Sequence, residues 1–244
     1  MTKFLSVAAI VILLGCNSGQ KTPDIRSIDV PLTTIRFEQS FFAIDTLRLD
    51  ASLQKLASQQ PLFTQDFLYN ILATTPETAM RDVPQFINAY QSLFKQTGAK
   101  FASIKTQEAA IKEGLKFVKY YFPEYKLPTK LITFIGPINS FGNIITIDAL
   151  AIGLQMYLGK NDPIYVSEEG QSLYPIYVSR RFEPEYMATN CMKNIRDDMF
   201  PLQDAGAPLC EQMVEAGKRL YFLKQVLPTE QDSIVTGYTA AQLE

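Results

Sequence analysis

The sequence of 244 residues contains no histidine. This absence excludes Ser-His-Asp and Cys-His catalytic systems and every zinc site with a histidine ligand. It also removes the side chain best suited to proton transfer near neutral pH. The chain has little net charge, with 23 basic against 25 acidic residues and a pI near 5.4, whereas nucleic-acid binding requires a basic surface. A Gly-rich phosphate loop is missing too, because Gly136 and Gly142 flank a proline and lack the Gly-x-Gly-x-x-Gly pattern.

The amino terminus carries an apolar run, residues 5–14, that is shorter than the about 20 residues of a membrane-spanning helix. It follows a single cation, Lys3, and therefore indicates an export signal. Leu13-Leu14-Gly15-Cys16 resembles the lipobox of bacterial lipoproteins, which implies cleavage before Cys16 and acylation of that residue. We predict a signal peptide over 1–15 and a lipid-modified Cys16. The alternative is an ordinary signal peptide with an incidental cysteine.

Residues 16–30 are mostly polar and have no helical period, so we predict a flexible tether between the lipid and the body. Two further cysteines, Cys191 and Cys210, remain in a chain that is expected to be exported. Oxidising conditions permit a disulfide between them. The alternative is a pair of separate buried thiols, since spacing in the sequence does not fix the distance between the two Cα atoms.

Residues 31–244 predict one α+β domain that is mostly helical. After an edge strand near Ile35, helical spacing dominates as far as residue 122. Residues 131–135 and 143–148 read as two strands of a small β-hairpin or sheet joined by a wide loop, and residues 149–158 return to helical spacing. Helices are expected over 191–200 and 208–226. In the second of these helices, five apolar residues at helical spacing are expected to face the core: Leu209, Met213, Ala216, Leu220 and Leu223.

The carboxyl-terminal residues Thr239-Ala240-Ala241-Gln242 have the form of a capping box, which marks the start of a helix. The sequence stops two residues later, and so short a helix is not stable alone. We therefore expect a chain that is truncated at its carboxyl terminus, with a fraying tail as the alternative.

Few polar groups are arranged for chemistry. Glu168 and Glu169 are adjacent and would suit a cation, or else form a solvated charge pair. Asp197 and Asp198 lie in a helical stretch, where adjacent side chains diverge by about 100° and do not share a site. No spacing singles out a Ser-Lys dyad. We predict no metal, no cofactor and no catalytic residue.

The densest polar cluster is Arg180-Arg181, which precedes Phe182-Glu183-Pro184-Glu185. Paired guanidinium groups suit the recognition of a carboxylate or another anion. The two arginines are therefore our candidates for contact with a ligand or partner. The alternative is a corner in which they pair with acidic side chains of the same chain.

Six segments together resemble the gliding-motility lipoprotein family GldB, in family order and over nearly the whole mature chain. They are residues 36–45 (RFEQSFFAID), 119–125 (KYYFPEY), 147–159 (IDALAIGLQMYLG), 177–187 (YVSRRFEPEYM), 217–222 (GKRLYF) and 237–243 (GYTAAQL). The resemblance implies a role in the gliding of certain Gram-negative bacteria, beside the envelope machinery and its linked secretion system. Family members continue past the last segment with a Trp-rich part, and the lack of tryptophan here fits the expected truncation.

Residues 213–222 (MVEAGKRLYF) are also similar to a helix of some zinc metallopeptidases. The His-Glu-x-x-His helix of those enzymes cannot be present without histidine. If the fold is shared, it would be a degenerate zincin-like fold without metal, with Glu215 as a remnant. We predict a lipoprotein anchored in a membrane and facing the periplasm, which supports gliding motility through protein contacts and not catalysis. The alternatives are a ligand-binding envelope lipoprotein and an envelope enzyme that uses carboxylates or a Ser-Lys pair.

Overall fold

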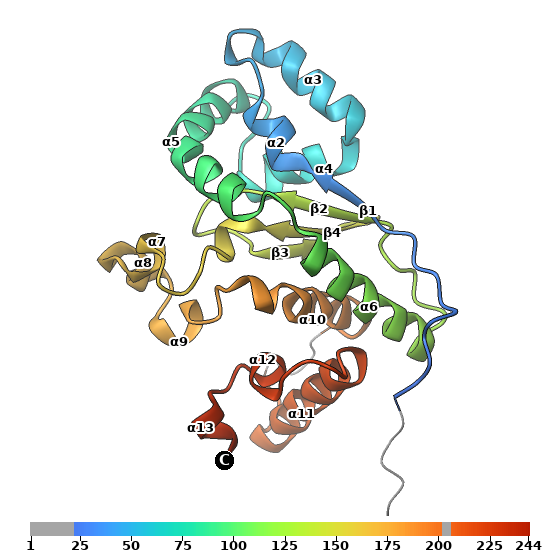
Figure 1. Ribbon diagram of the computed structural model, residues 1–244. Helices are drawn as coiled ribbons and strands as arrows, with labels where there is room; N and C mark the ends of the chain where they lie inside the picture. Colours follow the sequence, from blue (N-terminus) through green and yellow to red (C-terminus); the bar gives the residue numbers. More distant parts are fainter. Residues whose placement is uncertain (1–21, 202–205) are drawn as a thin grey trace, which may run out of the picture.

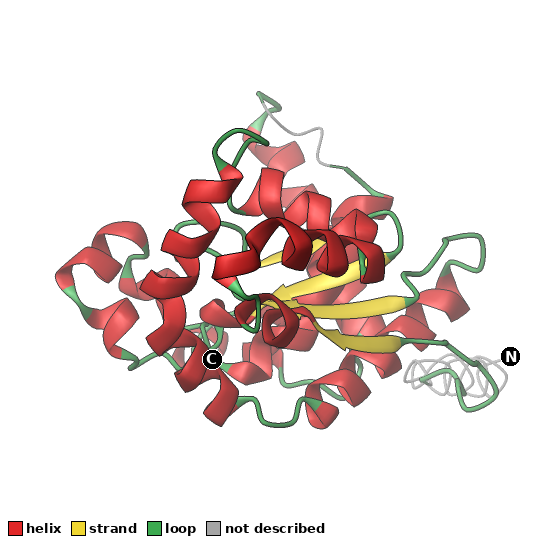
Figure 2. Cartoon of the chain, turned by 90° about the horizontal axis from the view of Figure 1, so that it is seen from above, coloured by secondary structure: helices red, strands yellow, loops and turns green. Residues whose placement is uncertain are grey.

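The computed structural model of the chain describes residues 22–201 and 206–244. The predicted signal peptide and Cys16 lie outside the described residues. A small four-stranded sheet lies between two layers of helices (Figure 1). One face carries the helices from α2 (Phe37–Phe42) to α5 (Ala79–Lys100), and the other carries α6 (Lys105–Tyr121) and α10 (Met187–Met199). Seen from above, the strands run through the middle of the molecule with helices around them (Figure 2). The predicted α+β class, mostly helical in one domain, is confirmed.

The sheet has the strand order β1-β2-β4-β3. Its strands are β1 (Thr33–Arg36), β2 (Lys130–Phe134), β3 (Asn143–Ile145) and β4 (Ala149–Gly153). The first strand is at the edge, as predicted, and pairs in parallel with β2, so that Thr33 lies opposite Lys130. The second strand pairs in parallel with β4, and β3 closes the other edge antiparallel to β4.

The expected helix over residues 149–158 is wrong, and so is the expected pairing of 131–135 with 143–148. Residues Ala149–Gly153 form β4, which inserts between the two strands that we expected to be neighbours; the hairpin joins β3 to β4. All five residues of β4 are buried because helices cover both faces of the sheet. A strand of this kind is apolar throughout and has no alternation, so its short run resembles a buried helix.

The layer on the first face follows the edge strand and is packed by phenylalanine rings. Phe37 lies 4.8 Å from Phe63 and 4.9 Å from Phe67, between ring centroids, and Phe67 lies 6.1 Å from Phe134 of β2. Such pairs add about 0.5–1.5 kcal/mol each beyond the burial of their area. The elements are α2 (Phe37–Phe42), η1 (Thr46–Arg48), α3 (Leu49–Gln59), α4 (Pro61–Asp66), η2 (Phe67–Ile71) and α5 (Ala79–Lys100).

The other face carries α6 (Lys105–Tyr121) and α10 (Met187–Met199), which cross closely at Gly114. A Cβ at Gly114 would lie 2.8 Å from the sulfur of Met192, so a larger residue there would require the Met192 side chain to shift. Beyond them lies α11 (Leu209–Val226), which contacts both helices. The remaining elements are η3 (Leu154–Met156), α7 (Pro163–Val166), α8 (Glu168–Leu173), α9 (Ile176–Ser179), η4 (Pro184–Tyr186), α12 (Asp232–Thr236) and α13 (Ala240–Leu243).

The expected inward face of α11 is wrong for most of the helix. The side chain of Leu209 is 72% exposed and that of Met213 is 66% exposed, whereas Leu223 is buried. Only the carboxyl-terminal part of α11 packs against the body, through Phe222, Leu223 and Val226. Apolar residues therefore occur on two sides of this helix, and periodicity alone does not tell which side is covered.

The amino-terminal end of the described chain is tied to the body. Ile25 and Ile28 pack against the core and Val30 is buried, so the packed part of the chain begins inside the predicted tether. At the other end, the side chain of Gln242 accepts a hydrogen bond from the backbone N–H of Thr239 at 2.9 Å, and the predicted capping box is confirmed. In the described ranges, none of the helices is long and apolar enough to cross a membrane.

Candidate functional site

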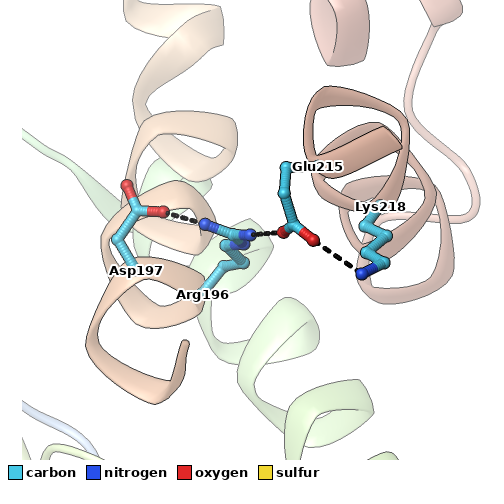
Figure 3. Close-up of polar contacts among 4 residues, drawn as sticks. All are labelled: Arg196, Asp197, Glu215 and Lys218. Carbon is cyan, nitrogen blue, oxygen red and sulfur yellow. Dashed lines mark hydrogen bonds and ion pairs between the residues drawn. The ribbon is translucent and has the colours of Figure 1, made fainter. Parts of the chain in front are cut away.

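A chain of ion pairs joins α10 to α11 (Figure 3). Arg196, in the last turn of α10, is 6% exposed. Its Nη1 donates to Oδ1 of Asp197 at 2.8 Å, and its Nη2 to Oε2 of Glu215 at 3.5 Å. The other oxygen of Glu215 accepts from Nζ of Lys218 at 2.6 Å. Arg196 and Asp197 of α10 thus share one network of ion pairs with Glu215 and Lys218 of α11.

A groove of about 620 Å³ lies beside this network, between the end of α6, the end of α10 and α11. We call it the α10–α11 groove. Five aromatic side chains line it, with the ring of Phe122 5.7 Å from Phe200 and 5.9 Å from Phe222. Tyr121 and Tyr221 complete the set. A concave, mostly aromatic surface with a few fixed charges is typical of a ligand site.

Glu215 is one of the polar groups that line this groove. Each of its two oxygens already accepts from a cation, so it would have to give up Arg196 or Lys218 before it took a proton from a substrate. Among residues 22–201 and 206–244, no three Cys, Asp or Glu side chains are grouped to hold a metal ion. The zincin-like interpretation of the helix around Glu215 remains a hypothesis from the sequence.

Asp197 and Asp198 diverge as the sequence predicts. Asp197 pairs with Arg196, whereas Oδ2 of Asp198 accepts a hydrogen bond from the hydroxyl of Tyr125 at 2.7 Å. Burial and, next, this bond to Asp198 raise the pKa of the Tyr125 hydroxyl. The second aspartate therefore fixes the loop after α6 onto α10.

Arg180 and Arg181 lie where α9 meets the turn after α12. Nη2 of Arg180 donates to the backbone carbonyl of Gly237 at 2.9 Å, and Nη2 of Arg181 to the carbonyl of Tyr177 at 3.2 Å. Arg181 also packs on Gly237, where a Cβ would lie 3.0 Å from its Nη1. Both guanidinium groups are thus oriented by backbone carbonyls, which do not neutralise their charge.

A third cation stands beside the two arginines. Nζ of Lys193 on α10 donates to Oδ1 of Asn190 at 3.3 Å. Burial first, and then the positive charge of Arg181, lower the pKa of Lys193, while Asp197 acts in the opposite direction. No local pattern indicates this third cation, because Lys193 is twelve positions beyond Arg181 and on another helix.

Large apolar side chains are exposed next to the arginines. Val166, Leu173, Ile176 and Tyr177 are 53%, 46%, 71% and 63% exposed. Together with Arg180 and Arg181 they form what we call the α8–α9 surface. Exposed apolar residues close to fixed charges are candidates for a site of interaction. Sequence reasoning found the arginines and missed the apolar residues, since short helices show no clear period.

Glu168 and Glu169 are the first residues of α8, directly after Ser167. The Ser167 hydroxyl accepts from the backbone N–H of Gly170 at 3.1 Å and caps the helix. Carboxylates in a first turn are favoured by the partial positive charge of the helix end. That location explains the acidic pair without a bound cation, although both side chains border a shallow depression with Ser167 and Ser172.

The cysteines that we considered for a disulfide are both free thiols. Cys191 faces the sheet and is fully buried, and its sulfur accepts from Nδ2 of Asn143 at 3.5 Å. Burial raises the pKa of its thiol. Cys210 is exposed, in the first turn of α11. The two side chains belong to opposite sides of the second helical layer, and the bridge is not formed.

The described part of this α+β domain thus carries an aromatic groove, a pair of arginines held by backbone carbonyls, and exposed apolar side chains. A family model described as "Gliding motility protein GldB" matches residues 18–244, and the chain therefore belongs to this family. The resemblance seen in the sequence is confirmed. No curated protein and no solved structure matches the chain.

Proposed function

We propose that this protein is a lipoprotein that supports gliding motility by binding a protein of the motility machinery, and not by catalysis. Residues 1–15 would direct export, Cys16 would carry the lipid, and the body would face the periplasm. Membership of the GldB family supports the link to motility in the cell envelope. Several acyl chains on Cys16 would anchor the protein stably and would keep its folded domain at the membrane surface.

The observation that carries this proposal is the α8–α9 surface. Tyrosine and arginine beside aliphatic residues are the composition of energetic centres of protein interfaces. Arg180 and Arg181 hold their charge at fixed positions because backbone carbonyls orient them. They present positive charge to a partner, and acidic side chains on that partner would complement it.

The test is a chromosomal replacement in a strain that glides. Tyr177→Ala combined with Arg181→Glu removes an apolar contact and reverses a charge, and we expect loss of colony spreading with normal protein abundance. The matched control is Leu47→Ala, because Leu47 is 95% exposed in the opposite helical layer. Normal spreading of the double variant would overturn the proposed surface, and normal spreading of a deletion strain would overturn the role in motility.

Crosslinking in the native envelope provides the biochemical counterpart. A photoreactive residue at Ile176, which is 71% exposed, should capture a specific partner, and one at Leu47 should not. Addition of Arg181→Glu should abolish the product at Ile176. A product that persists unchanged in this variant would contradict the role of the charge.

The α10–α11 groove favours a second candidate, an envelope lipoprotein that binds a small ligand. Its volume of about 620 Å³ and its five aromatic side chains suit an apolar molecule with a charged group facing Arg196 or Lys218. Anilinonaphthalene sulfonate has this chemistry and should bind with enhanced fluorescence. Phe200→Ala should weaken this binding, whereas Tyr177→Ala on the other surface should not.

A further inference from the structure

One face of α11 is apolar and exposed, and at its amino-terminal end Cys210 and Val214 line a hollow with Pro201 and Ala207. The residues of this face, Cys210, Met213, Val214, Gly217 and Tyr221, follow one another at helical spacing and are all exposed. Met213, Val214 and Tyr221 are 66%, 57% and 61% exposed. We call this stripe the outer face of α11. It lies opposite the buried side chains that hold the helix to α6 and α10.

The edges of this face carry charged groups. Lys218 and Glu211 lie along the side toward the α10–α11 groove, and Lys224 lies one turn beyond Tyr221 at the carboxyl-terminal end. Helices that lie in a membrane interface bury an apolar stripe and keep charged side chains at its borders. Lysine stems can cover apolar surface while their ammonium groups remain in water.

The position of the tether relates this face to a membrane. Asp29, Val30 and Pro31 lie against the loop that follows α6, and Tyr121 and Phe122 at the same end of α6 line the groove next to α11. In Figure 1 the first described residues leave the molecule at the end formed by α11 and α12, away from α3. Six residues separate Thr22 from Cys16, and an extended chain spans about 3.3–3.6 Å per residue, or ~20 Å in all.

We propose that the outer face of α11 rests on the lipid bilayer, with Met213, Val214 and Tyr221 in the interfacial region. This inference rests on the lipid anchor proposed at Cys16. A tether of ~20 Å keeps the bilayer within reach of this end of the molecule at all times, so that a weak apolar contact is formed at high effective concentration. A soluble partner or a second copy would have to reach the same face by diffusion.

The bound orientation has a consequence for the rest of the protein. With α11 on the bilayer, the layer of α2 to α5 points away from the membrane, because it lies on the other face of the sheet (Figure 1). The α8–α9 surface then stands at the side of the molecule, where a partner can reach it.

The native thiol Cys210 provides the test, because it lies in this face and Cys191 is fully buried. The full-length lipidated protein is labelled at Cys210 with a nitrobenzoxadiazole dye and reconstituted in vesicles of phosphatidylethanolamine and phosphatidylglycerol. We expect nitroxide-labelled lipids to quench this dye several-fold more than they quench a dye at position 47 in a Cys210→Ser, Leu47→Cys protein. Aqueous iodide should show the opposite order.

Flotation with the vesicles separates the two proposals. If the protein floats and iodide reaches the dye at Cys210 as well as it reaches position 47, the orientation is overturned while the anchor stands. If the protein does not float, the anchor fails and the orientation fails with it. Shielding of the dye from iodide in the Cys16→Ser protein, in buffer without bilayer or detergent, would show that protein covers the face and would overturn the proposal. A Val214→Asp variant that floats but loses lipid quenching would support it.

Discussion

The guanidinium of Arg180 donates a hydrogen bond at 2.9 Å to the backbone carbonyl of Gly237, which lies 57 residues further along the chain. Gly237 has a left-handed backbone, with φ of 73°, and ends α12. The neighbouring side chain of Arg181 packs on the same residue. A single glycine therefore positions both arginines of the α8–α9 surface.

Replacement of this glycine tests that arrangement. Gly237→Ala introduces left-handed strain of about 1–2 kcal/mol and a Cβ that meets Arg181. We expect lower stability in urea unfolding and loss of the crosslink from the α8–α9 surface. Gly206→Ala is the matched control, because Gly206 also has positive φ and a Cβ there meets nothing within 4 Å. Equal crosslinking by the two variants would contradict the role of Gly237.

The buried ion pairs between α10 and α11 predict a second result. Arg196→Met removes a 6%-exposed guanidinium that serves two carboxylates, and we expect a loss of about 1–3 kcal/mol in the free energy of unfolding. Lys218→Met should cost less than about 1 kcal/mol, since Lys218 is 64% exposed and water screens its pair with Glu215. Urea midpoints measure both. A larger effect at Lys218 would be inconsistent with the network as described.

Glu38 predicts a dependence of stability on pH. Its carboxylate is buried, where it accepts from Nε of Arg36 at 2.6 Å and from the hydroxyl of Thr133 at 2.7 Å. Burial outweighs these partners and raises the pKa of Glu38. The folded state thus binds the proton more tightly than the unfolded state, whose pKa is about 4.3. The stabilising contribution is full below about pH 4 and is lost as pH rises through the folded pKa.

Glu38→Gln removes this titration and preserves the shape of the side chain. The stability of the variant should therefore increase relative to the native protein between about pH 4 and about pH 7, as measured by urea unfolding across that range. Glu113→Gln, on the exposed side of α6, provides the control and should change little. A constant difference between native protein and Glu38→Gln across the range would refute the prediction.

The two thiols should differ in reactivity. Cys210 is exposed and should react with a disulfide reagent in the native protein, whereas Cys191 is fully buried and should react only after unfolding. Cys210→Ser should abolish the reaction of the native protein and leave intact the reaction of Cys191 after unfolding. Absence of any free thiol in the unfolded, unreduced protein would indicate the disulfide after all.

The anchor makes its own prediction. Labelled palmitate should enter the native protein in cells, and Cys16→Ser should abolish this incorporation because it removes the sulfur that takes the lipid. The variant should then appear in the soluble fraction after cell breakage. Palmitate incorporation that persists in Cys16→Ser would show that the lipid is attached to another residue.

Much of the fold followed from local patterns. The long helices α5, α6, α10 and α11 were evident from their period, and the edge strand near Ile35 from its composition. The central strand β4 was not, because a strand covered on both faces is apolar throughout and shares its sequence signal with a buried helix. Its misassignment also produced the wrong strand order.

The candidate sites were less accessible to sequence reasoning. Arg180 and Arg181 are evident in the sequence as adjacent charges. The orientation of their guanidinium groups involves contacts with Gly237, more than 50 residues further along the chain, which no local pattern indicates. The α10–α11 groove gathers residues from Tyr121 to Gln225, which no local motif connects. The expected inward face of α11 is covered only near its carboxyl-terminal end, at Leu223, because a period shows that one side of a helix is apolar and not what covers it.

The edge position of β1 has a mechanical meaning for a protein that is proposed to work in a moving cell. Any load between a lipid at Cys16 and the body passes first through residues 22–32 and then into β1, which is held along one side by its parallel pairing with β2. A pull along the strand strains these hydrogen bonds together, in shear, whereas a pull across it would unzip them singly. Val30, just ahead of the strand, is the first buried side chain of the described chain. It is therefore the first buried side chain that this load reaches.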